Sequence, residues 1–482
     1  MIGRAWVGLV AVVLLGISPR AHATTYTLED IVERVSRDFP AVAAAREGVA
    51  AAEAQLRAAR LAWLPAGDAT LYISGSPNVK CLSKPYDPTD VGNAKGSNTP
   101  DPNQAVREAN CMRTNVVSLN NNASGSSLVD IAPIHGLVLR LDVTLNQPIY
   151  SFGRIEAGIA AGKASVENAT AALYREQADA VVLANRAYFG VKAARAALGT
   201  LNEGVEKLRE WIAKIDQQLN GRNTSHYSES DLARLKVSLS FVLTQVYDQD
   251  RNLAYAERGL QLLLNDPHAD VDDRELELAS AEEPEPLDAW QQRARQRRPE
   301  MRLLAAGAHN AASVRAARFA EMLPELTFNT YLGVGYASSI DTPQNYFFNR
   351  PNFVNATFGL QLHQPLDLGV RVARWQQAKH DERATSARGR QSTLAYATDV
   401  AKAYEDYREA RARARETSKG ERISRGWFTS IDSNVASGLS ADGREAVEAA
   451  QNYFSFRLRN LQAVFEANMA LAQLQRVTAS LK

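Results

Sequence analysis

The chain has little of what several protein classes depend on. Its 482 residues include only two cysteines, and 55 lysines and arginines almost balance 54 aspartates and glutamates, which leaves a net charge of +1. This balance provides no broad positive field for nucleic acid, and the 45% of apolar residues exclude bulk disorder. After residue 23, no stretch approaches the roughly 18 consecutive apolar residues of a transmembrane helix. Any later segment that enters a membrane must therefore do so as a strand.

Motifs for metal or covalent chemistry are also missing from the sequence. The histidines after residue 23 are scattered, and none lies in an HExxH pattern or beside a plausible nucleophile: His135, His226, His268, His309, His363 and His380. Gly333 and Gly335 form a GxG pair, but Ser338 stands where a dinucleotide fingerprint needs a third glycine. We therefore predict no enzyme and no cofactor. The acidic segment 266–285 is interpreted as a solvated linker, with a cation site as the alternative.

The first residues indicate export. Arg4 precedes an apolar run from Ala5 to Ile17, and the triplet Ala21-His22-Ala23 is a typical cleavage site. We predict a signal peptide over residues 1–23 and a new N-terminus at Thr24; a retained membrane helix is the alternative. In an oxidising compartment, Cys81 and Cys111 are expected to form a disulfide, and two free thiols in a loop are the other possibility.

The rest of the chain is an internal repeat. A shift of 259 positions superposes several residues of the first half on the second: Leu28 on Leu287, Pro40 on Pro299, Gly48 on Gly307 and Tyr72 on Tyr331. A shift of 217 superposes Gln147-Pro148 on Gln364-Pro365 and Arg154 on Arg371. We predict a first repeat over 24–285, ending in a linker at 265–285, and a second repeat over 286–482. Each runs helix, strand, loop, strand, long helix, turn, helix.

Each repeat contains two amphipathic strands. Apolar residues at Leu137, Leu139, Leu141, Val143 and Leu145 alternate with a polar set that includes Arg140, Asp142 and Thr144. We expect strands near 67–75, 137–147, 326–336 and 353–363, with external loops at 76–136 and 337–352. Strands of this length and alternation are typical of transmembrane β-barrels. A small soluble sheet packed on helices would show the same alternation, so both interpretations stay open here.

The segments that are expected to form long helices have a different spacing of apolar residues. From Val181 to Leu219 apolar residues recur at spacings of 3 and 4 without a break, and a second such series runs from Leu232 to Leu263. A helix over 154–220 would extend roughly 100 Å, several times the need of a globular domain. The segments Thr27 to Leu64 and Asp231 to Leu264 are each about half as long. We interpret each repeat as one long helix paired with two shorter ones.

Four amphipathic strands cannot close a barrel alone, and an open edge in lipid leaves unpaired amides, so the chain is expected to oligomerise. The step from strand to long helix reads PIYSFGR and PLDLGVR, with Pro148, Gly153 and Arg154 in the first repeat and Pro365, Gly369 and Arg371 in the second. With the two-fold repeat, these steps resemble the TolC-type outer-membrane efflux protein family, whose pattern is P-L-F-D-G-G-R.

The resemblance implies a mixed, mainly α fold. Duplicated long helical hairpins would form a periplasmic α-barrel, and four strands would contribute to a trimeric transmembrane β-barrel with Arg140, Asp142 and Thr144 facing the lumen. The turns at 220–230 and 436–444 correspond to the periplasmic tip of the family. The second contains GLSADGR, so the resemblance implies the tip candidates Gly438, Leu439 and Asp442, with helix capping by Gly438 and Ser440 as the alternative. The nearby charges Arg222, Asp231 and Arg444 are candidates for gating ion pairs, with a solvated face as the alternative.

The resemblance also implies a function. The protein would be the passive exit duct of a tripartite efflux or type I secretion system, in the outer membrane of a Gram-negative cell and with a large periplasmic portion. Its expected partners are a homotrimer, a periplasmic adaptor (membrane fusion) protein, an inner-membrane RND, ABC or MFS transporter and outer-membrane lipid, with no nucleic acid. A periplasmic coiled-coil scaffold without a pore is the alternative. The sequence does not indicate the transported substrate.

Overall fold

The computed structural model describes residues 24–77, 79–81, 111–113, 134–220, 228–280, 283–338, 352–436 and 443–480. Two compact units are present. The helical unit comprises Met1–Glu53, Ala164–Ala308 and Ala384–Lys482, and the strand unit comprises Ala54–Lys163 and His309–Arg383. Cys81 and Cys111 lie in the described residues, whereas Arg222, Gly438, Leu439 and Asp442 lie outside them.

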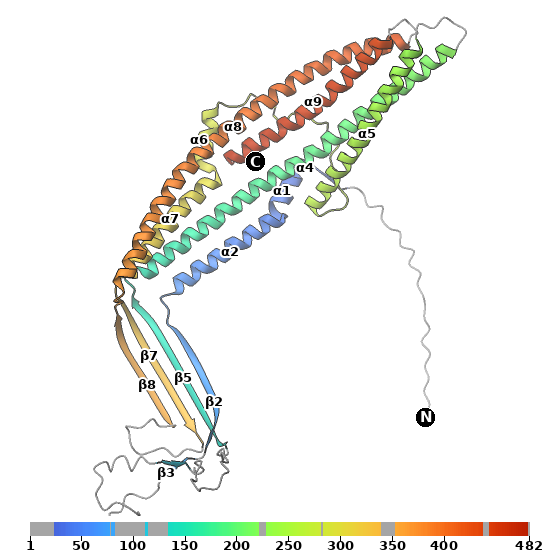
Figure 1. Ribbon diagram of the computed structural model, residues 1–482. Helices are drawn as coiled ribbons and strands as arrows, with labels where there is room; N and C mark the ends of the chain where they lie inside the picture. Colours follow the sequence, from blue (N-terminus) through green and yellow to red (C-terminus); the bar gives the residue numbers. More distant parts are fainter. Residues whose placement is uncertain are drawn as a thin grey trace, which may run out of the picture. The chain divides into compact units, whose positions relative to one another are not determined.

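The described elements follow the order expected from the repeat, with additional short strands (Figure 1). They are β1 (Thr24–Tyr26), α1 (Leu28–Asp38), α2 (Pro40–Leu61), β2 (Ala66–Pro77), β3 (Val79–Cys81), β4 (Cys111–Arg113), β5 (Ile134–Tyr150), α4 (Arg154–Asn220), α5 (Glu229–Leu264), β6 (Ala269–Val271), α6 (Leu287–Arg297), α7 (Pro299–Ala320), β7 (Glu325–Ala337), β8 (Phe353–His363), α8 (Leu368–Ala436) and α9 (Gly443–Thr478).

The leading helix of each repeat is broken at a proline, which corrects the single helix expected from Thr27 to Leu64. Phe39 has extended backbone (φ −62°, ψ 133°) between α1 and α2, and Arg298 has a similar conformation (φ −57°, ψ 126°) between α6 and α7. Pro40 and Pro299 follow directly, and proline disfavours helical backbone in the residue before it. The repeat therefore reproduces the break as well as the helices.

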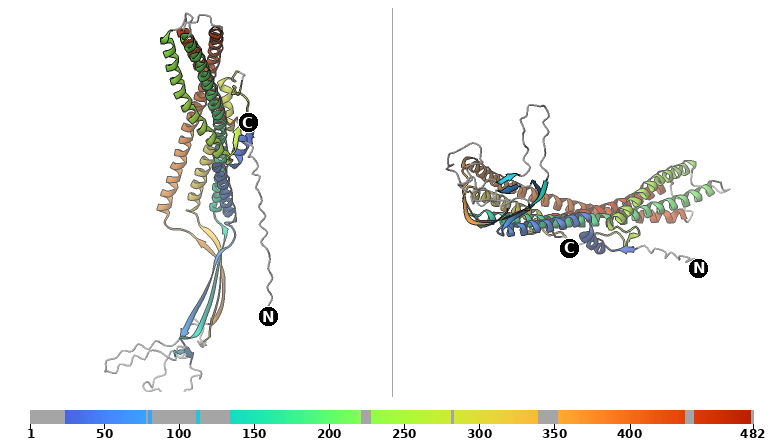
Figure 2. Two further views of the ribbon diagram at one scale, coloured as in Figure 1. Left: turned by 90° about the vertical axis from the view of Figure 1, so that its right-hand side faces the viewer. Right: turned by 90° about the horizontal axis from the view of Figure 1, so that it is seen from below.

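The apolar stripe of α4 contributes to two buried clusters of the helical unit. Near the end of α4, a buried cluster joins α4, α5, α8 and α9, whose ends lie side by side in Figure 2; its members are Leu208, Trp211, Ile215, Leu235, Phe428, Ile431, Ala446, Ala449, Ala450 and Tyr453. A second cluster packs α1 and the end of α5 on the part of α4 around Ala184 and Tyr188. In the part of the chain that is described, no helix is long and apolar enough to cross a membrane.

The linker between the repeats is fixed at several points. β1 pairs in parallel with β6, so that Thr24 lies opposite Ala269. Lys192, a buried side chain of α4, forms an ion pair with Asp272 (Nζ–Oδ1 2.5 Å). Burial disfavours the charge on Asp272, yet the hydrogen bonds from Lys192 and Tyr188 hold the pKa of that carboxyl below its usual value. The sequence predicted a solvated linker here, and the described contacts instead tie it to α4.

The strand unit contains one antiparallel sheet in the order β2-β5-β7-β8. Opposite Leu141 lie Leu71 on β2 and Val334 on β7, while opposite Asp142 lie Thr70 and Gly333. Because residues directly opposite one another share a face, the register joins the apolar positions of all four strands on one face and the polar positions on the other. β2 and β8 are the edges of this sheet within the described residues.

Candidate functional site

The polar face of the sheet is built around three side chains. Arg140 and Asp142 are two residues apart on β5 and form an ion pair (Nε–Oδ2 2.7 Å). Tyr331 of β7 donates from Oη to Oδ1 of Asp142 over 2.5 Å. The guanidinium of Arg140 lies 5.7 Å from the ring centre of Phe353 on β8. Arg140, Asp142 and Thr144 were predicted to share a polar face, and β5 places them at alternate positions.

Gly333 makes this arrangement possible. A Cβ atom at this position would lie 2.5 Å from Oη of Tyr331 and 3.0 Å from Cε2 of Phe353. A larger residue would therefore displace the tyrosine from Asp142. The GxG pair in the sequence thus has a packing role, and the sequence alone did not reveal Tyr331 and Phe353 as partners because their proximity depends on strand register.

The opposite face of the sheet is apolar and uncovered. Its large side chains are widely exposed: Leu71, Ile73, Leu137, Leu141, Leu145, Leu332, Val334, Val354, Phe358, Leu360 and Leu362. Leu360, for example, is 71% exposed. A continuous apolar face of this kind is typical of a surface that contacts lipid or another protein.

The strand-to-helix steps carry a hydrogen bond that the repeat duplicates. Gln147 donates from Nε2 to the carbonyl of Trp63, and Gln364 donates from Nε2 to the carbonyl of Met322 over 3.1 Å. Both glutamines precede a proline, Pro148 or Pro365. Each side chain thereby ties the end of its strand to the chain that enters the neighbouring leading strand.

The two predicted arginines of these steps have different partners. Arg154 forms an ion pair with Glu325 at the start of β7, whereas Arg371 pairs with Asp367 (2.6 Å) and donates to the carbonyl of Glu321 (2.9 Å). The glycines differ too. Gly153 has φ +92° and follows Phe152 at φ 51°, a left-handed turn that favours glycine, while Gly369 lies in the first turn of α8.

Of the tip candidates, Asp231 and Arg444 are described. Asp231 is the third residue of α5 and accepts hydrogen bonds from the backbone and hydroxyl groups of Ser228 (3.1 and 2.6 Å), while Ser228 Oγ accepts from the backbone amide of Asp231. This is a capping box, which stabilises the start of α5. Arg444 lies in the first turn of α9. The described contacts of Asp231 are thus local to α5.

The capping box predicts a pH dependence at the start of α5. The hydrogen bonds from Ser228 hold the pKa of Asp231 below its usual value, so its contribution to stability is complete above the unfolded-state pKa and is lost as pH falls through the lower folded-state pKa. We expect Asp231→Asn to destabilise the protein by about 1 kcal/mol at pH 7. The difference from wild type in thermal unfolding should shrink as pH falls below about 4; a constant difference down to the lowest pH would contradict the assignment.

The cysteine prediction can also be tested. β3 pairs antiparallel with β4, and Cys81 lies opposite Cys111 in that register. Directly opposite residues of an antiparallel pair have the Cα separation that a disulfide needs. We expect the intact mass of the exported protein to increase by two hydrogens on reduction, and alkylation to occur only afterwards. Two thiols that alkylate without reductant would contradict the bridge.

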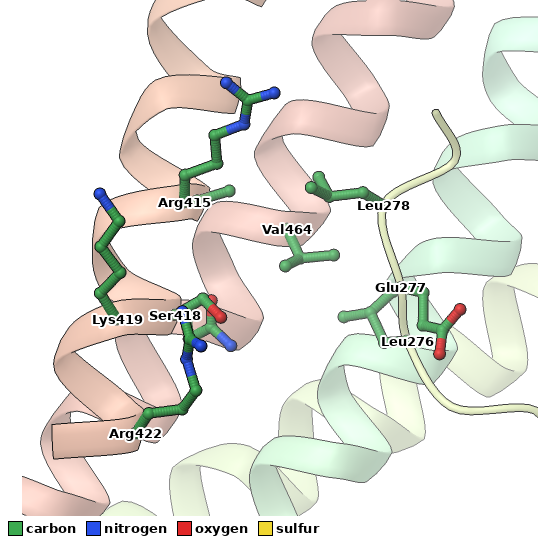
Figure 3. A pocket seen from close by; sticks show the side chains of 10 residues that line it. Leu276, Glu277, Leu278, Arg415, Ser418, Lys419, Arg422 and Val464 are labelled. Atoms are coloured by element: carbon green, nitrogen blue, oxygen red, sulfur yellow. The ribbon is translucent and has the colours of Figure 1, made fainter. Parts of the chain in front are cut away.

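The helical unit has a groove beside the linker, between Leu276–Leu278 and helices α8 and α9 (Figure 3). It encloses about 390 Å³ and has Arg415, Lys419 and Arg422 on its α8 side. Arg415 already pairs with Glu283 (2.6 Å), and Lys419 pairs with Glu416 (2.6 Å). The lining contains no histidine, cysteine or aspartate. Among the described residues, no three histidine, cysteine or acidic side chains are grouped to hold a metal ion.

Comparison with solved structures shows that this chain has the fold of outer-membrane channels. The channel OprN is 17% identical, with 94% of this chain and 89% of that chain covered and a TM-score of 0.68. CmeC of Campylobacter jejuni is 13% identical, with 94% of this chain and 85% of that chain covered and a TM-score of 0.65. VceC of Vibrio cholerae is also 13% identical, with 94% of this chain and 95% of that chain covered and a TM-score of 0.66. Identities this low define the fold alone. A search of curated proteins finds no match.

The sequence itself matches a family model in its second repeat. Residues 290–480 match the model of the outer membrane efflux protein family. The match falls in the second repeat, which contains the PLDLGVR step and the segment around Arg444. The predicted resemblance to the TolC-type outer-membrane efflux family is therefore confirmed, on a match that covers the second repeat.

Proposed function

We propose that this protein is a passive exit duct of the outer membrane, which works as a homotrimer with a periplasmic adaptor and an inner-membrane pump. One observation carries the proposal: a four-stranded sheet with one uncovered apolar face, one polar face and two open edges, in a chain with the fold of outer-membrane channels. The family match favours the duct over the periplasmic scaffold without a pore.

The open edges and the exposed helix surface support oligomerisation. A closed barrel needs more strands than one chain supplies, and antiparallel β8 and β2 of successive copies would continue the alternation of the sheet. Large apolar side chains of α5 are also uncovered in a single chain, among them Phe241 at 62% and Tyr255 at 71%. In the proposed trimer, Arg140, Asp142 and Thr144 face the aqueous lumen and Leu141 faces lipid.

Export and the periplasmic contacts belong to the same proposal. A signal peptide over 1–23 would deliver the chain to the periplasm, and the repeats over 24–285 and 286–482 would place the turns 220–230 and 436–444 toward the adaptor. The pump, of RND, ABC or MFS type, would supply the energy, since the duct performs no catalysis. A passive duct needs no resident cofactor.

Conductance tests this proposal directly. The purified protein in a planar bilayer should form channels, and detergent should be needed to release it from cells. Protein that is released by osmotic shock and never conducts would support the scaffold instead.

A tip variant extends the test to gating. If Arg222, Asp442 or Arg444 makes ion pairs across a closed tip, their joint replacement by alanine should raise single-channel conductance. Asp231 is left intact because its contacts cap α5. A matched control replaces three exposed cations of α4 and α5, Arg186, Arg209 and Lys236, and should leave conductance unchanged. Equal conductance in all three proteins would argue against a charge-held tip.

A further inference from the structure

Exposed aromatic residues mark the point where the sheet gives way to helix in the first repeat. Trp63, between α2 and β2, and Tyr150, at the end of β5, are each 56% exposed. Their chains are tied together there, because Gln147 donates to the carbonyl of Trp63. Tryptophan and tyrosine prefer the interface between membrane and water, where an apolar ring meets a polar surrounding.

Cations without an ion pair among the described residues lie on the two helices that lead to this point, α2 and α4. α2 and α4 pack closely at Leu56 and Gly162, where a Cβ atom on Gly162 would lie 3.1 Å from Cδ1 of Leu56. The residues that follow in the two helices are Arg57 and Lys163, and Arg60 lies one turn further along α2 toward Trp63. Arg57, Arg60 and Lys163 are exposed and have no ion pair within the described residues. We call Arg57, Arg60, Trp63, Tyr150 and Lys163 the junction patch.

The carboxylates near the strand-to-helix steps do not form ion pairs with this patch. Glu325 pairs with Arg154, Glu321 with Arg318 (2.8 Å) and Asp367 with Arg371 (2.6 Å). The remaining nearby carboxylates, Glu53, Asp68 and Glu156, form no ion pair with Arg57, Arg60 or Lys163 within the described residues. These three cations are thus free to bind an anionic ligand from outside the chain.

We propose that the junction patch binds the phosphate headgroup of an anionic phospholipid in the periplasmic leaflet. The proposal rests on the proposed function, because it needs the apolar sheet face in a bilayer. Lysine and arginine side chains near an anionic membrane surface attract it by about 1 kcal/mol each, which is about fivefold in affinity. The acyl chains would lie along the uncovered apolar face that begins with Leu145 and Leu71, while the aromatic rings sit at headgroup level.

Detergent-solubilised protein allows a direct test. We expect dioleoyl phosphatidylglycerol to raise the thermal unfolding temperature more than dioleoyl phosphatidylcholine does, and native mass spectrometry to show bound phosphatidylglycerol. The triple variant Arg57→Gln, Arg60→Gln, Lys163→Gln should lower the phosphatidylglycerol affinity roughly a hundredfold and abolish the difference between the lipids. Trp63→Ala should weaken the binding of both lipids.

The control replaces Arg186, Arg209 and Lys236 by glutamine, which removes the same charge from exposed positions of the helical unit. This control should retain the full difference between the two lipids in thermal unfolding temperature. Inorganic phosphate alone should give no stabilisation; stabilisation by phosphate would indicate an anion site unrelated to lipid. Equal effects of the two lipids on wild type, or equal losses in the control and the triple variant, would overturn the proposal.

Conductance separates this proposal from the proposed function. The triple variant should conduct like wild type, because its charges lie outside the polar face of the sheet. A wild-type protein that shows the lipid difference but never conducts would contradict the duct and leave the lipid site standing. A protein that conducts but is stabilised equally by the two lipids would contradict the lipid site and leave the duct standing.

Discussion

Replacing Leu141 by lysine should keep the protein out of the outer membrane, whereas lysine at Thr144 should be tolerated. Leu141 is the central apolar position of β5 and is 38% exposed on the face it shares with Leu71 and Val334. A lysine that faces lipid near the bilayer midplane costs about 2–4 kcal/mol, and a trimer would contain three of them. Density-gradient fractionation and the oligomer band on a mild detergent gel measure the outcome.

Thr144 provides the matched control for this change. It lies three residues along the same strand on the opposite face, so the same charge would enter water instead of lipid. Thr144→Lys should assemble normally and shift only the ion selectivity of the channel. If the two variants assemble equally well, or if only Thr144→Lys fails, the assignment of the faces is wrong.

The second large effect is expected at Trp211. This side chain is 1% exposed in the cluster at the end of α4, its ring centre lies 5.7 Å from that of Phe428, and its Nε1 donates to Oδ1 of Asp432 over 3.0 Å. Trp211→Ala removes the ring from the contact between α4 and α8 and should cost about 3–5 kcal/mol. Amide hydrogen exchange in the last turns of both helices should accelerate by about two to four orders of magnitude, since 1.4 kcal/mol is a factor of ten.

Two further variants separate packing from hydrogen bonding at this position. Trp211→Phe keeps a ring but loses the donor to Asp432, which still contacts Lys207 (3.3 Å), so we expect a loss of about 1–3 kcal/mol. Trp427→Ala removes a partly buried ring from the edge of the same cluster and should have a smaller effect than Trp211→Ala. An equal effect of all three would indicate general loosening of the helix ends rather than a contact centred on Trp211.

The sequence predicted which side chains share each face of the strands, because in a strand alternate residues always point to the same face. Leu137 to Leu145 fall on one face of β5 and Arg140 to Thr144 on the other, and a slip by one residue would reverse every side chain. The internal repeat then transferred the prediction to β8. The long seam of α4 likewise predicted its core, since Ala184, Val191 and Ile215 are all buried.

Contacts that depend on register or on distant segments were not predictable in this way. Tyr331 reaches Asp142 only because β7 pairs with β5 in one particular alignment, and no local pattern encodes that alignment. The parallel pair β1-β6 consists of three residues a side, too few for any periodicity. The break before Pro40, in contrast, follows from a local rule and was missed because the apolar pattern continues across it.

The pairing of β1 with β6 has a consequence for the order in which the protein assembles. Thr24 donates its backbone amide to the carbonyl of His268 over 3.0 Å, and Tyr26 donates its hydroxyl to Asp266 over 2.9 Å. A chain that emerges from its N-terminal end must keep these residues unpaired until the linker, some 245 residues later, has also emerged. Closing so long a loop is entropically costly, so β1 is expected to dock late. A bulky affinity tag fused directly before Thr24 would then interfere with the final step of folding, and a tag inserted between β4 and β5 would spare it.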